Sequence, residues 1–437
     1  ELAGTKQPIT IMINANRYVE AYFMADTFTT FAPNSLCAVG STLYFLATGP
    51  YSGTELWKTD GTFEGTRLVK DVLPGQGGAG IQFMRNLNGT LYFLGWGNSE
   101  NALWKSDGTE DGTVIVAGLG ASSPIIEPEV VGNSMYFSTS ETDSGKLWIT
   151  DGTTEGTRTV KSWGLNSHPG TMVNCDGVLY FSNKVQYDPQ IMTLWKSDGT
   201  EAGTIPVFSS RDTNEIAGLG GQVFFQAASE TVHGALMVTD GTPAGTRDLH
   251  NFDYGPGNLV VSGGLLYFGA ELDVNLLNTQ IWATNGTSTF RADGYSYRPW
   301  SLTAFNGKLL YCALYDVDSQ PHTGLFATTG SGGTLLSTIN PTLFYGANNY
   351  TAVVGDTMFF TAENSHGQEG LWKSDGTAPG TGMVSDISDT PIGIAPTDLT
   401  AMNGKLYFSA GDTAHGHQLW TSDGTAAGTL PISCPTP

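Results

Sequence analysis

The chain has little positive charge. Its 437 residues include 19 lysines and arginines against 41 aspartates and glutamates, which leaves a formal charge of −22. This imbalance opposes binding to nucleic-acid phosphates and to anionic lipid, so we expect no nucleic-acid partner. No apolar run approaches the roughly 20 residues that span a bilayer, and we expect no membrane insertion. The sequence starts at Glu1 without a methionine or a signal-like stretch, which is typical of a processed, secreted chain.

Cysteine is scarce as well. Cys37, Cys175, Cys312 and Cys434 contain no C-x-x-C pair, so they offer neither a zinc-binding spacing nor a disulfide scaffold. Charged residues make up only 14% of the chain, whereas there are 57 glycines and many threonines and aromatic residues. This composition favours strands, and we expect an all-β protein with almost no helix.

The sequence is rich in repetition. The segment L-W-K-S-D-G-T-x-x-G-T, or a degraded copy of it, occurs nine times, and successive copies are 42 to 48 residues apart. The copies are anchored at Trp57, Trp104, Trp148, Trp195, Met237, Trp282, Phe326, Trp372 and Trp420. A period of this length is typical of propeller blades or solenoid units.

Each repeat has the order of a four-stranded sheet. In the second copy, an apolar run before Asn88-Gly89 is followed by apolar runs at 91–94, at 102–105 and, after Asp107-Gly108, at 114–116. Asn-Gly and Asp-Gly favour tight reversals, so these runs predict four antiparallel strands. A parallel β-helix would have shorter rungs. We therefore predict a single β-propeller of nine four-stranded blades of about 45 residues, with eight blades as the alternative if a weak copy is displaced.

The D-G-T-x-x-G-T segment is interpreted as a turn. Aspartate accepts hydrogen bonds from amides two residues on, and the following glycine takes the positive φ of a tight reversal. Single carboxylates that are far apart do not form a cation site, and two copies carry Asn285 and Thr329 instead of aspartate. We expect no metal and no cofactor. The repeated aspartates are Asp60, Asp107, Asp151, Asp198, Asp240, Asp375 and Asp423.

The repeated tryptophan is interpreted as blade core, because Met237 and Phe326 replace it in two copies. Trp96, Trp163 and Trp300 fall outside this register. We predict that they contact a partner from loops, and the alternative is that each covers a local gap in the core.

Candidate catalytic residues are few. One histidine precedes the repeated Leu-Trp position in four copies, which is typical of a turn residue, and His415 and His417 could form at most a weak metal pair. No nucleophile elbow, P-loop or dinucleotide fingerprint is present, so we expect no enzyme. A carboxylate pair in the central channel stays open as an alternative. The four repeat-related histidines are His233, His322, His366 and His415.

The repeats resemble the ELWxxDGT repeat family of bacterial extracellular and cell-surface proteins. The first copy reads E-L-W-K-T-D-G-T from Glu55 to Thr62, and the resemblance covers about residues 37 to 433. Copies six and seven depart most from the motif. The resemblance implies a propeller-like fold and a location outside the cytoplasm, and it implies no reaction.

The two ends of the chain do not balance. We predict an N-terminal extension over residues 1–28 and the nine-repeat propeller over 29–437. Residues 3–11 resemble the last strand of a repeat, yet residues 428–432 already complete the ninth copy. The extra strand could close its own ring, add to a neighbouring subunit, or belong to a plug over the ring. The residues predicted for self-association are Thr10, Ile11, Tyr18, Tyr22, Phe23 and Met24.

The sequence thus predicts a secreted or cell-surface, non-catalytic structural or adhesive protein. It is expected to form a homo-oligomer or filament through its N-terminal strand. One alternative is a lectin-like propeller that binds glycan, which loop aromatics beside Asp or Asn would favour. A second alternative is a polysaccharide hydrolase or lyase, which two carboxylates in one pocket would favour.

Overall fold

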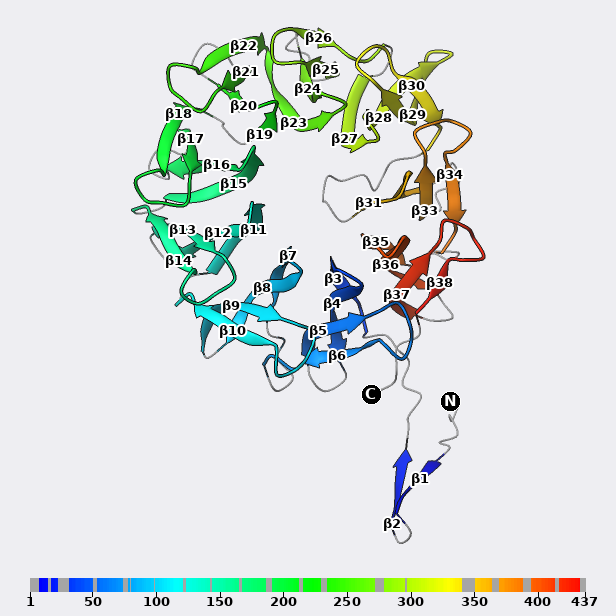
Figure 1. The fold of residues 1–437 in the computed structure, drawn as a ribbon. Helices are drawn as coiled ribbons and strands as arrows, with labels where there is room; N and C mark the ends of the chain where they lie inside the picture. The colour runs from blue at the N-terminus through cyan, green and yellow to red at the C-terminus, as the bar shows by residue number, and fades with distance from the viewer. Residues whose placement is uncertain are drawn as a thin grey trace.

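The computed structural model of the chain is a closed ring of nine blades, and each blade is a four-stranded antiparallel sheet (Figure 1). The all-β propeller is confirmed, with nine blades and not eight. Among the residues described there is no helix, and so none with the length and hydrophobicity needed to cross a membrane. The structure describes residues 8–14, 17–22, 31–49, 53–73, 78, 80–97, 99–120, 123–141, 144–164, 167–185, 191–211, 215–228, 234–271, 279–294, 297–339, 350–363, 369–387, 394–412 and 416–432.

Each blade uses four consecutive strands, and blades are numbered 1 to 9 along the chain. Blades 1 to 3 contain β3 (Asn34–Val39), β4 (Thr42–Gly49), β5 (Gly53–Thr59), β6 (Arg67–Lys70), β7 (Gln82–Leu87), β8 (Thr90–Gly97), β9 (Glu100–Ser106), β10 (Val114–Gly118), β11 (Ser123–Val131), β12 (Ser134–Glu141), β13 (Ser144–Thr150) and β14 (Arg158–Ser162). Blades 4 to 6 contain β15 (Ser167–Cys175), β16 (Val178–Val185), β17 (Met192–Ser197), β18 (Ile205–Ser210), β19 (Ile216–Leu219), β20 (Gln222–Ala227), β21 (Gly234–Thr239), β22 (Arg247–Phe252), β23 (Tyr254–Ser262), β24 (Leu265–Glu271), β25 (Gln280–Thr284) and β26 (Thr289–Arg291). Blades 7 to 9 contain β27 (Tyr297–Phe305), β28 (Lys308–Val317), β29 (Gln320–Thr328), β30 (Thr334–Ser337), β31 (Thr351–Val354), β32 (Thr357–Glu363), β33 (Glu369–Ser374), β34 (Gly382–Ser385), β35 (Ile394–Met402), β36 (Lys405–Asp412), β37 (Gly416–Ser422) and β38 (Leu430–Pro431).

The first strand of each blade lines the centre of the ring, and the fourth strand forms the outer edge (Figure 1). Strands within a blade alternate in direction. The turn between the first two strands and the turn between the last two strands therefore lie on the same side of the ring. The second of these is the D-G-T turn, and we call this side the D-G-T face.

The hydrophobic core is divided among the interfaces between blades. Phe93 and Phe181, from the Leu-Tyr-Phe runs of the second strands, are fully buried, and Phe93 stacks on Trp104 with ring centroids 5.9 Å apart. Burial of a large apolar side chain stabilises the fold by roughly 1.5–3 kcal/mol. The interpretation of the repeated aromatic as core is therefore confirmed. Its buried members are Trp57, Trp104, Met237, Trp282, Phe326, Trp372 and Trp420.

Neighbouring blades make a recurring contact on the D-G-T face. In blade 2, the Tyr92 hydroxyl donates a hydrogen bond to the carbonyl of Gly152 in the D-G-T turn of blade 3, at 3.3 Å. A Cβ atom on Gly152 would overlap this hydroxyl, and the φ of Gly152 is +93°. Both facts restrict the position to glycine.

The ring closes without exchange of strands. The fourth strand of blade 9 is β38, and blade 1 begins with β3. One core cluster at this seam combines side chains from both blades, among them Trp57 and Tyr407. The Ser35 amide donates to Asp398 Oδ1 at 3.0 Å, and the Tyr407 ring lies against Gly61. The seam thus has the same Tyr-on-Gly contact as the interface between blades 2 and 3.

The N-terminal residues form a hairpin of β1 (Pro8–Asn14) and β2 (Arg17–Tyr22), which Figure 1 shows apart from the ring. Thr10 lies opposite Glu20, and Ile11 lies opposite Val19. The alternative in which the N-terminal strand completes the last blade is not found. Residues 428–432 follow directly from the third strand of that blade, and closing a short loop costs less entropy than closing a ring-sized one.

Candidate recognition face

Each regular D-G-T turn is held by one set of side-chain hydrogen bonds. In blade 4, Asp198 Oδ1 accepts from the amide and the hydroxyl of Thr200, at 2.9 and 2.7 Å. The Thr200 hydroxyl accepts from the Gly203 amide at 2.9 Å, and Ser197 Oγ accepts from the Gly199 amide at 3.1 Å. Blades 1, 2, 3, 5, 8 and 9 repeat the aspartate bonds. These are the bonds of Asx and Ser/Thr turns, so the interpretation of the motif as a turn is confirmed.

The same hydrogen bonds keep the turn aspartates charged. Bonds from the hydroxyl and the amide of Thr62 lower the pKa of Asp60 below its ordinary value of 3.8. The corresponding threonines lower the pKa of the other six, Asp107, Asp151, Asp198, Asp240, Asp375 and Asp423. All seven side chains are exposed, so these turns carry negative charge on the surface even in mildly acidic solution.

Further carboxylates gather in the turns of blades 1 to 4, at positions where the repeat motif is variable. The turn segments 60–66, 107–113, 151–157 and 198–204 contain no lysine or arginine. The turns of blades 5 to 9 carry only three carboxylates, on Asp240, Asp375 and Asp423. We call the nine exposed carboxylates of blades 1 to 4 the acidic arc: Asp60, Glu64, Asp107, Glu110, Asp111, Asp151, Glu155, Asp198 and Glu201.

Two basic side chains near the acidic arc, Lys70 and Arg158, donate to backbone carbonyls. Lys70 Nζ donates to the carbonyl of Glu110 at 3.1 Å, and an Arg158 guanidinium nitrogen donates to the carbonyl of Gly199 at 2.8 Å. Arg247 makes the corresponding bond to the carbonyl of Gly286 between blades 5 and 6. Basic side chains that bond to a turn carbonyl therefore occur both among blades 1 to 4 and between blades 5 and 6. The extra turn carboxylates occur only in blades 1 to 4.

Apolar side chains are exposed beside the acidic arc. Phe63, inside the first turn, is 46% exposed. Leu68, Val114 and Ile205, which follow the turns of blades 1, 2 and 4, are also exposed. Charged groups with adjoining apolar surface are typical of sites that bind another protein.

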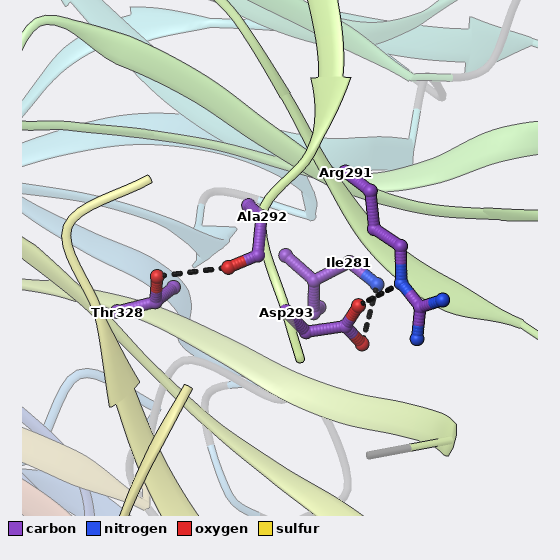
Figure 2. A network of polar contacts seen from close by, with 5 residues as sticks. All are labelled: Ile281, Arg291, Ala292, Asp293 and Thr328. Carbon is purple, nitrogen blue, oxygen red and sulfur yellow. Dashed lines mark hydrogen bonds and ion pairs between the residues drawn. The ribbon is translucent and has the colours of Figure 1, made fainter. Parts of the chain in front are cut away.

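Blades 6 and 7 use a different polar arrangement, shown in Figure 2. The Asp293 carboxylate, which is closed off from solvent, accepts the Ile281 amide at 3.2 Å and the Arg291 Nε at 2.7 Å. Thr328 of blade 7 donates to the Ala292 carbonyl at 3.0 Å. The groups drawn in Figure 2 satisfy one another, so this cluster joins two blades and does not form a reactive site.

The three tryptophans predicted as partner contacts have different surroundings. Trp96, on β8, is 41% exposed. Trp163 is half-buried and lies edge-on to Trp195 with ring centroids 5.4 Å apart. Trp300 is half-buried against the core between blades 7 and 8. Only Trp96 has the exposure that a partner contact requires.

The residues predicted for self-association lie in or beyond the N-terminal hairpin. Thr10 and Ile11 are on β1, Tyr18 and Tyr22 are on β2, and both strands pair with each other. The remaining two, Phe23 and Met24, lie outside the described residues.

The predicted histidine positions that the structure describes, His322 and His417, do not form a catalytic group. His233, His366 and His415 lie outside the described residues, and His322 lies beside Tyr315. His417 Nε2 is 2.6 Å from Ser409 Oγ, but Ser409 is fully buried and no substrate could reach it.

Within the described ranges no group of three or more histidine, cysteine, aspartate or glutamate side chains could hold a metal ion. Burial raises the pKa of the Cys37 thiol to about 11, which disfavours a reactive thiolate.

Sequence reasoning identified the turn but missed the acidic arc. The signal lies in the variable positions of D-G-T-x-x-G-T, where Glu64, Glu110, Asp111, Glu155 and Glu201 stand in the first four copies and no later copy carries a carboxylate. The charge of these positions becomes meaningful only when the topology brings the turns to one face.

Comparison with known proteins finds matches among solved structures alone. A scan against protein-family models and a search of curated proteins find no match. The β-propeller domain of the trilobed protease from Pyrococcus furiosus, described as having an open velcro topology, is 10% identical with a TM-score of 0.40, and the alignment covers 71% of this chain and 98% of that domain. A prolyl endopeptidase is 12% identical with a TM-score of 0.45, covering 77% of this chain and 55% of the endopeptidase. An uncharacterized protein of Listeria monocytogenes is 10% identical with a TM-score of 0.43, covering 82% and 96%.

These comparisons correct two predictions. We expected a non-catalytic structural or adhesive protein, but the similar propellers with a named activity belong to peptidases, which contradicts that prediction. The expectation that the chain is not an enzyme is contradicted on the same ground. The likeness itself, at 10–12% identity, describes the fold and assigns no reaction to this chain.

Proposed function

We propose that this chain is a recognition propeller that binds a cationic segment of a partner polypeptide across the acidic arc. The observation that carries the proposal is the concentration of nine turn carboxylates on four consecutive blades of one face. The partner is expected to be rich in lysine or arginine and to carry apolar residues that cover Phe63 and its neighbours.

Electrostatics favours an extended cationic partner over a single ion. The carboxylates are distributed over four blades, two or three to a turn, and the described residues contain no group of three or more histidine, cysteine, aspartate or glutamate side chains that could hold one metal ion. A flexible chain with several basic residues can contact successive turns, and the summed attraction also raises the association rate. Because the carboxylates are exposed, salt screens the attraction strongly.

The turns present their charges in a fixed geometry. Four aspartates of the arc are each held by a threonine, and each turn is tied to the sheet by the hydroxyl that precedes this aspartate. The four are Asp60, Asp107, Asp151 and Asp198. A surface that is already ordered loses little conformational entropy when a partner binds. Since hydrogen bonds lower the pKa of Asp60 and its counterparts below 3.8, these four aspartates should keep their share of the attraction in mildly acidic solution.

Fluorescence anisotropy with a labelled lysine- and leucine-containing peptide tests the proposal. The key variant combines Glu64→Gln, Glu110→Gln, Asp111→Asn, Glu155→Gln and Glu201→Gln. It removes five of the nine charges of the arc and leaves the four aspartates that hold the turns. We expect affinity to fall at least about tenfold, as for a loss of 1.4 kcal/mol of attraction, and to fall for the full-length protein as salt rises.

A matched control removes the same number of charges elsewhere. Five exposed carboxylates of blades 5 to 8 are changed to amides in this control: Asp248, Asp253, Asp316, Asp318 and Asp356. The control should bind as the unchanged protein does. Equal weakening in both variants would show that only net charge matters, and absence of salt-sensitive binding in the unchanged protein would overturn the proposal outright.

A further inference from the structure

The interface between blades 8 and 9 contains an open pocket on the D-G-T face. Its volume is about 160 Å³, and its walls include Thr357, Phe359, Lys373, Asp423 and Gly424. Thr357 and Phe359 come from β32, Lys373 comes from β33, and the other two come from the D-G-T turn of blade 9. The pocket lies outside the acidic arc.

The pocket exists because blade 8 lacks a hydroxyl that six other blades have, and Thr357 is too short to fill the space. The position of Phe359 is tyrosine in six other blades, including Tyr180 of blade 4, whose hydroxyl lies against Gly241. Phe359 brings only ring carbons to Gly424. Blade 5 also has phenylalanine here, but the side chain of Gln222 lies against Gly286 and fills the space. The counterpart of Gln222 in blade 8 is the shorter Thr357.

Two opposite charges line the pocket. Lys373 Nζ donates one hydrogen bond to the carbonyl of Gly424 at 2.8 Å, and an ammonium group has three N–H donors. Asp423 Oδ1 accepts from the amide and the hydroxyl of Thr425, at 2.9 and 2.7 Å. These bonds lower the pKa of Asp423, so its carboxylate is ionised at neutral pH.

We propose that this pocket binds a small zwitterion, namely a free α-amino acid, with its carboxylate toward Lys373 and its ammonium group toward Asp423. A simple anion would be attracted by Lys373 and repelled by Asp423. A simple cation would be attracted by Asp423 and repelled by Lys373. A ligand that carries both charges gains from both residues. The volume suits a small amino acid such as alanine or serine, whose side chain would lie against the Phe359 ring.

Titration calorimetry with glycine, alanine and serine tests the proposal, with acetate and methylammonium as ligands that carry only one charge. We expect saturable binding in the millimolar range for at least one amino acid, which is typical of a ligand with few atoms. Acetate and methylammonium should bind at least about tenfold more weakly, because each lacks one charge-assisted hydrogen bond.

Three variants locate the site. Phe359→Tyr restores the hydroxyl found at the closed interfaces and should abolish binding while the protein stays folded. Lys373→Met and Asp423→Asn should each weaken binding at least about tenfold. The asparagine keeps the turn, because Asn285 accepts the same bonds from Thr287 in blade 6.

Lys196→Met is the matched control. Lys196 occupies the position of Lys373 at the interface of blades 4 and 5, where Tyr180 fills the space against Gly241. Amino-acid binding should be unchanged in this variant, and circular dichroism and thermal melting confirm that each protein is folded. The proposal is wrong if the unchanged protein shows no saturable binding, if Phe359→Tyr binds as well as the unchanged protein, or if Lys196→Met loses as much affinity as Lys373→Met.

Discussion

Blade 4 and blade 6 build the same turn from different residues. In blade 4 the acceptor is Asp198, and in blade 6 it is Asn285, which receives the amide and the hydroxyl of Thr287 at 3.0 and 2.8 Å. In both blades the residue before this acceptor, Ser197 or Thr284, has a hydroxyl that accepts a hydrogen bond from the amide of the turn glycine. That bond is present in all nine blades. The hydroxyl and the glycine therefore define the turn, and the carboxylate is replaceable.

Blades 6 and 7 compensate for what their sequences lack. Blade 6 has no second Gly-Thr pair, so Thr284 bonds to the Ser288 carbonyl instead of to a partner threonine. The Asp293 carboxylate accepts the Ile281 amide within blade 6, and Thr328 of blade 7 donates to the carbonyl of Ala292 in blade 6. Blade 6 thus replaces the missing threonine pair with bonds of its own and shares one further bond with blade 7.

The largest expected effect concerns the aromatic core, which blades 4 and 7 should share equally. Phe181 and Tyr311 are both fully buried and stack on the aromatic residue of the third strand. Phe181→Ala and Tyr311→Ala should each lower the free energy of unfolding by about 3–5 kcal/mol. Urea denaturation measures both. A much smaller loss for Tyr311→Ala would show that the divergent blade is less tightly packed than the regular one.

Removal of the buried carboxylate of blade 6 should have the next largest effect. Asp293→Ala leaves the Ile281 amide and the Arg291 Nε without their acceptor, so we expect a loss of about 1–3 kcal/mol. Asp293→Asn retains a side-chain oxygen for the Ile281 amide and should lose less. Equal losses in the two variants, measured by thermal melting, would argue against a role for the hydrogen bond.

Loss of the turn hydroxyl should cost the same in both kinds of blade. Ser197→Ala and Thr284→Ala each remove the acceptor of a glycine amide, and we expect about 1 kcal/mol for each. Asp198→Asn should change stability less at neutral pH, because the amide oxygen accepts the same bonds. If Asp198→Asn were the more damaging change by urea denaturation, the carboxylate would be essential to the turn after all.

The smallest expected effect is a difference in pH dependence. Hydrogen bonds from Thr200 hold the pKa of Asp198 below its ordinary value of 3.8. The charged Asp198 carboxylate therefore contributes its full stabilisation at pH values above about 3.8. This stabilisation is lost as the pH falls from there toward the pKa of Asp198 in the folded protein. Asn285 does not titrate, so the turn of blade 6 makes no such pH-dependent contribution to stability. Melting temperatures between pH 5 and about 3 should fall less steeply in Asp198→Asn than in the unchanged protein.

The repeat period and the strand order of the fold could be predicted because they depend on features inside one copy. The alternation around Leu91 to Leu94 and the turn at Asp107-Gly108 are local signals, and they recur. Contacts between copies leave no such signal. The Tyr92 hydroxyl on Gly152 joins residues of different blades, so the sequence did not show that this glycine is required for packing as well as for its φ.

The candidate sites depend on contacts that spacing does not reveal. Trp163 falls outside the repeat register and was predicted to contact a partner, yet it packs edge-on against Trp195 of the next blade, as expected from the alternative that it covers a local gap in the core. The pocket beside Phe359 arises from the absence of one hydroxyl and the shortness of Thr357, which a single copy read alone does not distinguish from ordinary variation. The N-terminal hairpin pairs with itself, and its resemblance to a final blade strand concealed that outcome.

Because no sheet of the ring borrows a strand from the other end of the chain, every blade corresponds to one uninterrupted stretch of coding sequence. Duplication or deletion of about 45 residues would then add or remove a whole sheet and leave each remaining sheet intact. In a ring latched by strand exchange, the same event at the junction would separate a strand from its sheet. An architecture of this kind can change its circumference in single genetic steps, and the two copies that have drifted furthest from the motif show how much a blade can vary while the ring stays closed.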